Sequence, residues 1–234
     1  MEVPTLMGNV LIFDVETAGG FAAPKVYDCG GCVMDTATGY IQHRFHYGVL
    51  EVLGNPQLMA TAYYGWKMPK YWQSVYERKT VPMPFADVLR KLTATVDFYD
   101  IEAIAAYNAG FDMRAMRATC EWLYENSNWM NRDVKVWDIW GGACSNICNT
   151  EKFFKWAERN GYISEAGNPK TSAEVVFQYI TGKPAFEEEH IGLADSEIEA
   201  AILHSVLRRK RKADLTIRPN PWQEVGNKYK ASRA

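Results

Sequence analysis

The chain has 234 residues, of which 47% are hydrophobic, so it is long enough to form one large domain with a sizeable core. No apolar run approaches the roughly eighteen residues of a membrane span, and the start Met-Glu-Val-Pro lacks the regions of a signal peptide. We therefore expect a soluble, cytoplasmic protein. The net charge is -2, but nine Lys or Arg and two Asp or Glu follow Leu207, so an acidic body precedes a basic tail. That distribution suits a protein that handles a polyanion, although a solvated helix end with a loose tail is an equal alternative.

The first stretch of interest joins a strand to two carboxylates. Four apolar residues at positions 10–13 predict a buried strand, and Asp14 and Glu16 follow it. Because side chains alternate along a strand, the two carboxylates are expected to point to the same face. Their repulsion raises their pKa values unless a cation lies between them, and Mg2+ or Mn2+ prefers carboxylate oxygens. The alternative is a strand that simply ends in a polar loop.

The next elements predict a hairpin and then alternating helices and strands. Residues 26–34 and 40–49 are strand-like, and the short Gly-containing joint between them predicts an antiparallel hairpin. Residues 84–99 carry apolar side chains at helical spacing, and residues 101–107 are typical of a short buried strand.

A second motif follows that strand. Asp112 is expected to open a helix from Met113 to about Asn126, and an Asp at a helix start is ordinarily a cap. Further along we expect a strand at residues 134–138 and helices around residues 153–156 and 173–180.

A third motif precedes the last predicted helix. His190 lies in the loop before this helix, and Asp195 lies at or within its first turn. A lone His in such a loop is ordinarily a hydrogen-bonded residue, but this one is followed five positions later by a carboxylate. The order of the elements predicts an α/β fold, a mixed sheet flanked by helices, in which sites form at the C-terminal ends of strands. The acidic residues of the three motifs are therefore expected to converge.

Taken together, the three motifs resemble those of the DEDD superfamily of 3′-to-5′ exonucleases, specifically its DEDDh branch. They read Asp14-x-Glu16, Asn108-x-x-Phe111-Asp112 and His190-x-x-x-x-Asp195. The resemblance implies a ribonuclease H-like fold, hydrolysis from a 3′ end, and His190 as general base. It also implies two divalent metal ions, held by Asp14, Glu16, Asp112 and Asp195. Residues 194–200 resemble phage-type members, which would place the protein in a host cytoplasm.

The chemistry of phosphodiester hydrolysis suits these residues. Two ions about 4 Å apart can stabilise the attacking and the leaving oxygen. Asp14 is the natural bridge between the ions, with Glu16 and Asp195 completing the first and Asp112 serving the second. An imidazole such as that of His190 can accept the proton, which typically contributes roughly 100- to 10,000-fold.

Three further residues are candidates for substrate binding. Thr17 can hydrogen-bond the terminal nucleotide or, equally, stabilise the turn, and Asn108 belongs to the second motif. Trp72 lies in residues 63–79, where six aromatic and four basic side chains interleave. Unpaired bases stack on such rings while phosphates meet the cations, but the rings can also pack a helix onto the sheet.

We therefore expect a metal-dependent 3′-to-5′ exonuclease that releases nucleoside 5′-monophosphates from single-stranded DNA. The alternatives are a 3′-to-5′ exoribonuclease and a catalytically silent nucleic-acid-binding or polymerase-associated subunit. A DNA polymerase or replication protein is a conceivable partner. The predicted exonuclease domain spans residues 1–207, with an aromatic and basic insert at about residues 52–83, and residues 208–234 form a basic tail.

Overall fold

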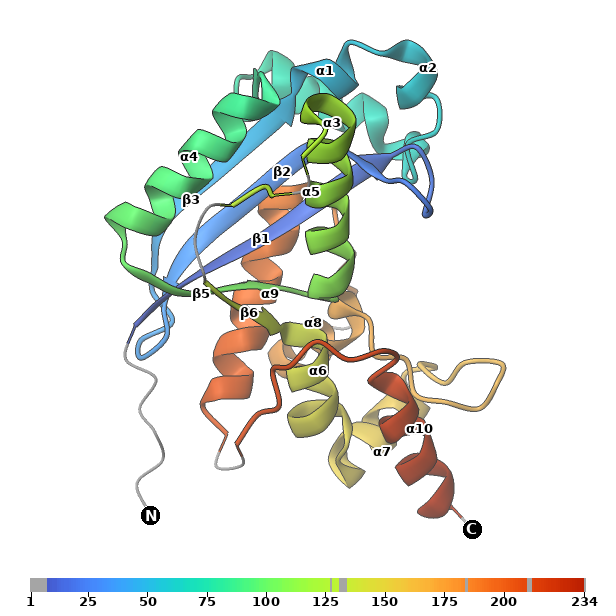
Figure 1. Ribbon diagram of the computed structural model, residues 1–234. Coiled ribbons are helices and arrows are strands. Elements are labelled where there is room, and N and C mark those ends of the chain that lie inside the picture. The colour runs from blue at the N-terminus through green and yellow to red at the C-terminus, as the bar shows by residue number, and fades with distance from the viewer. Residues whose placement is uncertain (1–7, 127, 131–133, 184, 210–211, 234) are drawn as a thin grey trace.

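The structure is a computed structural model that describes residues 8–126, 128–130, 134–183, 185–209 and 212–233. At its centre lies a six-stranded sheet in the order β4-β3-β2-β1-β5-β6 (Figure 1). The strands are β1 (Asn9–Ala18), β2 (Lys25–Asp35), β3 (Ile41–Val49), β4 (Val81–Met83), β5 (Ile101–Ala106) and β6 (Lys135–Asp138). β1, β2 and β3 pair antiparallel, and the other three strands join in parallel. The predicted hairpin and the predicted mixed sheet are confirmed.

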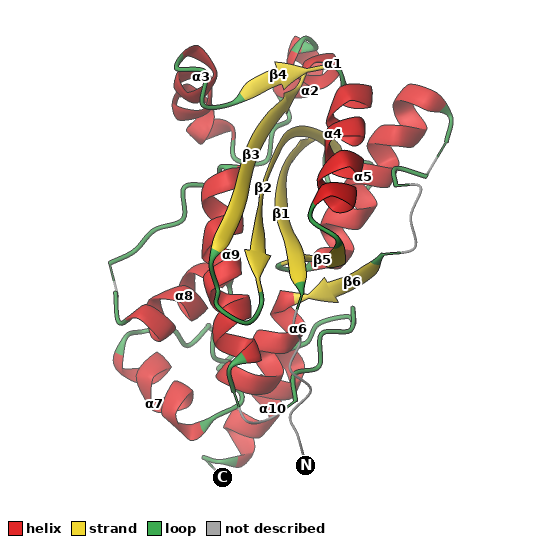
Figure 2. Ribbon diagram, turned by 90° about the vertical axis from the view of Figure 1, so that its left-hand side faces the viewer, coloured by secondary structure: helices red, strands yellow, loops and turns green. Residues whose placement is uncertain are grey.

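Helices cover both faces of the sheet (Figure 2), which explains the run of apolar residues in β1. Leu11 and Phe13 enter one core, whereas Val10 and Ile12 enter the other. The first core includes α3 (Met68–Tyr76), α4 (Phe85–Phe98) and α5 (Ala109–Tyr124); the second includes α6 (Ile139–Ala143), α7 (Glu151–Arg159), α8 (Ala173–Thr181), α9 (Gly192–Leu207) and α10 (Trp222–Ala231). The short elements are α1 (Leu50–Leu53), α2 (Pro56–Met59), η1 (Gly65–Lys67) and the π-helix η2 (Cys144–Cys148). No helix in the described ranges is both long and apolar enough to cross a membrane.

β1 is longer than the sequence predicts. It does not stop at residue 13 but pairs with β2 as far as Ala18, while its parallel pairing with β5 ends at Ile12. Asp14 and Glu16 therefore lie within the strand, on the segment that extends past the end of β5. Because β2 continues to supply backbone partners, both carboxylates are held by regular sheet structure.

The start of α5 also differs from the prediction. The helix begins at Ala109, and Asp112 lies inside its first turn and does not open it. Asn108 precedes the helix in the left-handed conformation, with a φ of 67° and no side-chain cap. The cap comes from Asp138, whose Oδ1 accepts the backbone N–H of Asn108 at 3.1 Å and that of Ala109 at 3.4 Å. A capping residue thirty positions away leaves no local signal in the sequence.

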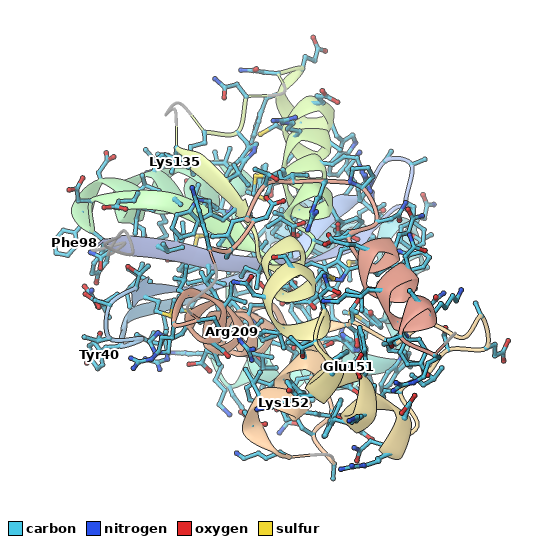
Figure 3. The ribbon with its side chains drawn as sticks, turned by 90° about the horizontal axis from the view of Figure 1, so that it is seen from below. Tyr40, Phe98, Lys135, Glu151, Lys152 and Arg209 are labelled. Atoms are coloured by element: carbon cyan, nitrogen blue, oxygen red, sulfur yellow. The ribbon has the colours of Figure 1, made fainter. Side chains whose placement is uncertain are left out.

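The C-terminal segment packs against the body of the molecule. The carbonyl of Leu215 accepts the backbone N–H of Asp138 at 2.8 Å, and Val225 of α10 is fully buried. Arg209 donates to the carbonyl of Asn146, and Glu151 lies 3.7 Å from Arg233 (Figure 3, where Arg209 and Glu151 are labelled). Within the basic run after Leu207, Lys210 and Arg211 lie outside the described residues.

Candidate functional site

Two carboxylates of the site come from β1 and a third from α5. Asp14 and Glu16 face the same pocket, as their spacing predicts, and Glu16 is almost fully buried. Asp112 lies beside them because its Oδ1 accepts the backbone N–H of Val15 at 3.3 Å. This bond ties the first turn of α5 to the segment of β1 that carries the other two carboxylates.

Asp195 reaches the same pocket because α9 begins very close to the sheet. A Cβ atom on Gly192 would lie 2.6 Å from the nitrogen of Gly30 and 2.8 Å from the carbonyl oxygen of Asp14, so only glycine permits this approach. The backbone N–H of Gly192 donates to Oδ2 of Asp28, which is buried, at 3.0 Å. One turn of helix then places Asp195 in the pocket, as the sequence predicts.

The pocket has a volume of about 380 Å³, within the range of roughly 300–1,000 Å³ that small-ligand sites occupy. Of the eight residues that the sequence singles out, all but Trp72 line it; they are Asp14, Glu16, Thr17, Asn108, Asp112, His190 and Asp195. Trp72 lies on α3, where its ring makes an edge contact with Tyr71 and its side chain is 43% exposed. It is not part of this cavity.

The carboxylates destabilise one another's charged forms. Burial is the main cause that raises the pKa of Asp112 to about 8 and that of Asp195 to about 9. Repulsion from the charge of Asp14 raises the pKa of Asp195 further. The pKa values of Asp14 and Glu16 are raised well above their usual range for the same two reasons. A cluster of this kind is stable in its charged form only when positive charge enters it.

The donor set fits a divalent cation. Glu16, His190 and Asp195 each offer one ligand atom, and these atoms lie within 4.8 Å of one another, the only such group found in the described part of the chain. Oδ1 of Asp195 is buried and has no hydrogen-bond partner there. Carboxylate oxygens with an imidazole nitrogen are suitable ligands for Mg2+ or Mn2+, with the oxygens as the preferred donors.

Two acidic residues of the pocket were missed at the sequence level. Burial raises the pKa of Glu188 to about 7, with repulsion from Glu174 as the next cause. Glu199 is buried on α9, four residues after Asp195, so the two share a helix face. That spacing was a readable signal for Glu199. Glu188 had none, because it is one of three consecutive glutamates.

His190 is held by residues 61–70 of the predicted insert, which we call the clasp. The ring of Tyr64 stacks on the imidazole, with centroids 3.8 Å apart and planes 9° apart. Lys67 Nζ donates to the carbonyl of Glu188 at 2.5 Å, and Lys70 lies 2.9 Å from the carboxylate of Glu189. The clasp therefore contacts the three residues 188–190 in succession.

The same segment is anchored to the end of β1. The backbone N–H of Tyr63 donates to the carbonyl of Thr17 at 3.2 Å, and the N–H of Gly19 donates to the hydroxyl of Thr61 at 2.8 Å. The clasp thus bridges the strand that carries Asp14 and Glu16 and the loop that carries His190.

His190 is kept in its neutral form. Burial, followed by the positive charge of Lys67, lowers the pKa of the imidazole to about 4. Its Nδ1 lies 4.0 Å from Oε2 of Glu188, and its backbone has a φ of 48°, in the left-handed region. A neutral imidazole at the edge of a carboxylate cluster can accept a proton or bind a cation.

The aromatic residues of the insert have different environments. Tyr71 is buried and its hydroxyl donates to the carbonyl of Tyr27 at 3.3 Å, so this ring belongs to the core. Tyr63 and Tyr64 line the pocket, whereas Trp66 and Tyr76 are exposed by 74% and 89%. Aromatic side chains that pack in the core, line the pocket or face solvent thus follow one another along the insert.

No protein-family model matches the sequence, and no curated protein matches it. Solved structures do match. A 3′-exonuclease structure described as "3'-end specific recognition of histone mRNA stem-loop" superposes with a TM-score of 0.54 at 12% identity, covering 89% of this chain and 85% of that one. The nuclease domain of 3'hExo, described as a DEDDh family member bound to rAMP, superposes with 0.52 at 12% identity over 92% and 98%.

E. coli Exonuclease I in complex with a 5cy-dT13 oligonucleotide superposes with a TM-score of 0.52 at 16% identity. The match covers 83% of this chain but 39% of that one, so the chain spans less than half the length of this neighbour. At these identities the likeness shows a shared fold, the ribonuclease H-like α/β sheet that the sequence predicts.

Proposed function

We propose that this protein is a divalent-cation-dependent 3′-to-5′ exonuclease that removes nucleoside 5′-monophosphates from single-stranded DNA. The observation that carries the proposal is the convergence of Asp14, Glu16, Asp112 and Asp195 with His190 in one pocket. These residues come from three motifs, and Asp14 and Asp195 lie 181 positions apart. Nothing in core packing requires four acidic side chains to meet. Structures with the same fold include an exonuclease in complex with a 5cy-dT13 oligonucleotide and a nuclease domain bound to rAMP, which supports the proposal.

The four carboxylates would hold the cations: Asp14 would contribute to both, Glu16 and Asp195 would complete the first, and Asp112 would serve the second. When bound, such ions stabilise the charge that develops on the attacking and leaving oxygens. His190, neutral because its pKa is lowered, would accept the proton of the attacking water. Tyr64 would keep its imidazole aimed into the pocket.

The pocket also offers groups to the terminal nucleotide. Thr17 and Asn108 line it and are proposed to hydrogen-bond the substrate. Phe21, Tyr63 and Phe111 line the pocket and form a chain of edge contacts, with the ring centroids of Phe21 and Tyr63 5.1 Å apart and those of Phe21 and Phe111 6.4 Å apart, and these rings can stack on bases. Trp72 would act outside the cavity, on a more distant part of the strand, where its exposed ring is available.

A 3′-to-5′ exoribonuclease is the second candidate, since two neighbours of the same fold are described with a histone mRNA stem-loop and with rAMP. The basic residues after Leu207 are proposed to bind phosphates in either case, and residues 1–207 to form the exonuclease domain. A catalytically silent subunit, with or without a polymerase partner, would keep the pocket without turnover.

One assay separates these candidates. DNA and RNA strands of identical sequence, labelled at the 5′ or the 3′ end, are incubated with Mg2+ or Mn2+ and, in parallel, with chelator. The proposal predicts a descending ladder from the 5′ label, immediate release of a mononucleotide from the 3′ label, and no reaction with chelator. Faster loss of RNA would favour the second candidate. Internal cleavage, or an unchanged rate in chelator, would refute the proposed mechanism.

A further inference from the structure

Glu199 has no assigned role, yet its environment resembles that of the motif carboxylates. It lies on α9, is 3% exposed, and lines the pocket with Asp14, Asp112 and Asp195. The backbone N–H of Tyr107 acts to lower the pKa of this carboxyl group, against the larger effect of burial, which raises it. Its Oε2 is buried and has no hydrogen-bond partner in the described residues. A buried carboxylate oxygen without a partner is costly for the fold unless a ligand uses it.

Burial is the main cause that raises the pKa of Glu199, and the charged side chains that act on it are acidic. Asp14 and Asp112 exert the largest repulsion on it, and Asp195 adds a smaller one. No Lys or Arg is among the charged groups that shift the pKa of Glu199. The positive charge of Lys67, by contrast, acts to lower the pKa values of Asp195 and Glu188. Glu199 is therefore an extra negative charge in a cluster that already repels itself.

Its position distinguishes it from the group formed by Glu16, His190 and Asp195. The ligand atoms of those three residues lie within 4.8 Å of one another, and Glu199 does not belong to that group. Asp14, Asp112 and Glu199 line the same pocket outside that group.

We propose that Glu199 is a fifth carboxylate of the cation site and that it binds, together with Asp14 and Asp112, the second divalent cation. This inference rests on the proposed function, because it assumes that the pocket binds two cations. An added carboxylate increases the negative charge of the ligands around the second cation, and the affinity of a site for hard cations rises with the charge of its ligands. The second cation should therefore bind more tightly than a site with Asp14 and Asp112 alone would allow.

The test measures Mn2+ binding to the full-length protein without substrate, by isothermal titration calorimetry and by the electron paramagnetic resonance signal of free Mn2+. The wild type should bind two ions. Glu199→Gln keeps the shape of the side chain and removes its charge, so it should weaken one binding event by about 10-fold or more and leave the other within about 2-fold.

Glu197→Gln is the matched control. It makes the same change two residues away on α9, where Glu197 is exposed and its Oε1 accepts from Arg44 at 2.5 Å. Both binding events should persist in this variant. Circular dichroism and melting verify folding; if Glu199→Gln does not fold, Glu199→Asp, which keeps the charge but withdraws the oxygens, should weaken the same event.

The outcomes separate the two proposals. A wild type that binds no Mn2+ would refute the cation site of the proposed function and this inference together. A wild type that binds two ions, with a folded Glu199 variant that binds both equally well, would overturn the role of Glu199 alone. Equal weakening of both events, or a wild type with a single event, would overturn its assignment to a second cation.

Discussion

The carboxylates and the imidazole of the candidate site are held in different ways. Asp14, Glu16, Asp112 and Asp195 lie on β1, α5 and α9. The backbone N–H of Val15 ties β1 to α5, and that of Gly192 ties α9 to Asp28 of β2. His190 lies in a loop, where the ring of Tyr64 stacks on it and two lysines of the clasp bind the preceding residues Glu188 and Glu189. The cation ligands thus belong to the rigid fold, whereas the proposed base depends on side-chain contacts from a distant insert.

This contrast has a consequence for function. Sheet and helix elements open with the global unfolding of a protein, while loops open at lower free energy. Variants of the clasp should therefore impair turnover without altering cation binding, and variants of the carboxylates should impair both.

The largest effect is expected for Asp14→Asn. Removing the charge shared by both proposed cation positions should reduce turnover by about 1,000-fold or more, since charge stabilisation is the main contribution of such a site. The labelled-strand assay measures the rate, and Glu102→Gln, an exposed acidic residue on β5, is the control. Normal activity in a purified Asp14→Asn protein would remove Asp14 from the site.

A smaller effect is expected for His190→Ala. Loss of a general base should lower the rate by roughly 100- to 10,000-fold while Mn2+ binding stays nearly unchanged. Because His190 also lies within 4.8 Å of ligand atoms of Glu16 and Asp195, it could instead bind the cation. A parallel fall in Mn2+ affinity and rate would identify it as a ligand and contradict its role as base.

Substitutions in the clasp should lower the rate less than His190→Ala does. Tyr64→Ala removes the ring that stacks on His190 and should lower kcat by roughly 10- to 100-fold through misplacement of the imidazole. Tyr64→Phe keeps the stack and should retain most of the activity. Equal losses in the two variants would show that the hydroxyl matters and that stacking does not.

The carboxylates should also make the cation-free protein sensitive to pH. The folded-state pKa values of Asp112 and Asp195, about 8 and about 9, exceed the ordinary value of 3.8 that the unfolded chain regains. Between about pH 4 and pH 9 the folded state binds more protons, so the free energy of unfolding falls as the pH rises. In chelator, Tm should drop by at least about 5 °C from pH 5 to pH 8.5, as thermal melts would measure. A Tm that rises over this range would contradict the raised pKa values.

Much of the sheet and of the carboxylate set could be predicted from the sequence, because those features are local. The apolar run at residues 10–13, the hairpin joint and the helical spacing at residues 84–99 each depend on nearby residues. The motif spacings place acidic groups where strands end and helices begin. The structure brings them together as expected.

The features that sequence reasoning missed depend on contacts far apart in the chain. β1 continues to Ala18 because β2 pairs with it, and α5 starts at Ala109 because Asp138 caps it. The clasp meets His190 across more than 120 positions. The spacing of Glu199 from Asp195 signals a shared helix face, but the burial of Glu199 comes from the packing of α9 against the sheet.

The most direct test of the cation site is a comparison of melting temperatures at pH 8 for the wild type and Asp14→Asn, each with chelator and with Mg2+ or Mn2+. Repulsion among the carboxylates predicts that the cation raises Tm of the wild type by several degrees. In chelator, Asp14→Asn should melt at or above the wild type, because one repelling charge is gone, and it should gain little from the cation. An equal cation gain in both proteins, or a lower Tm for Asp14→Asn in chelator, would contradict a cation site built around Asp14.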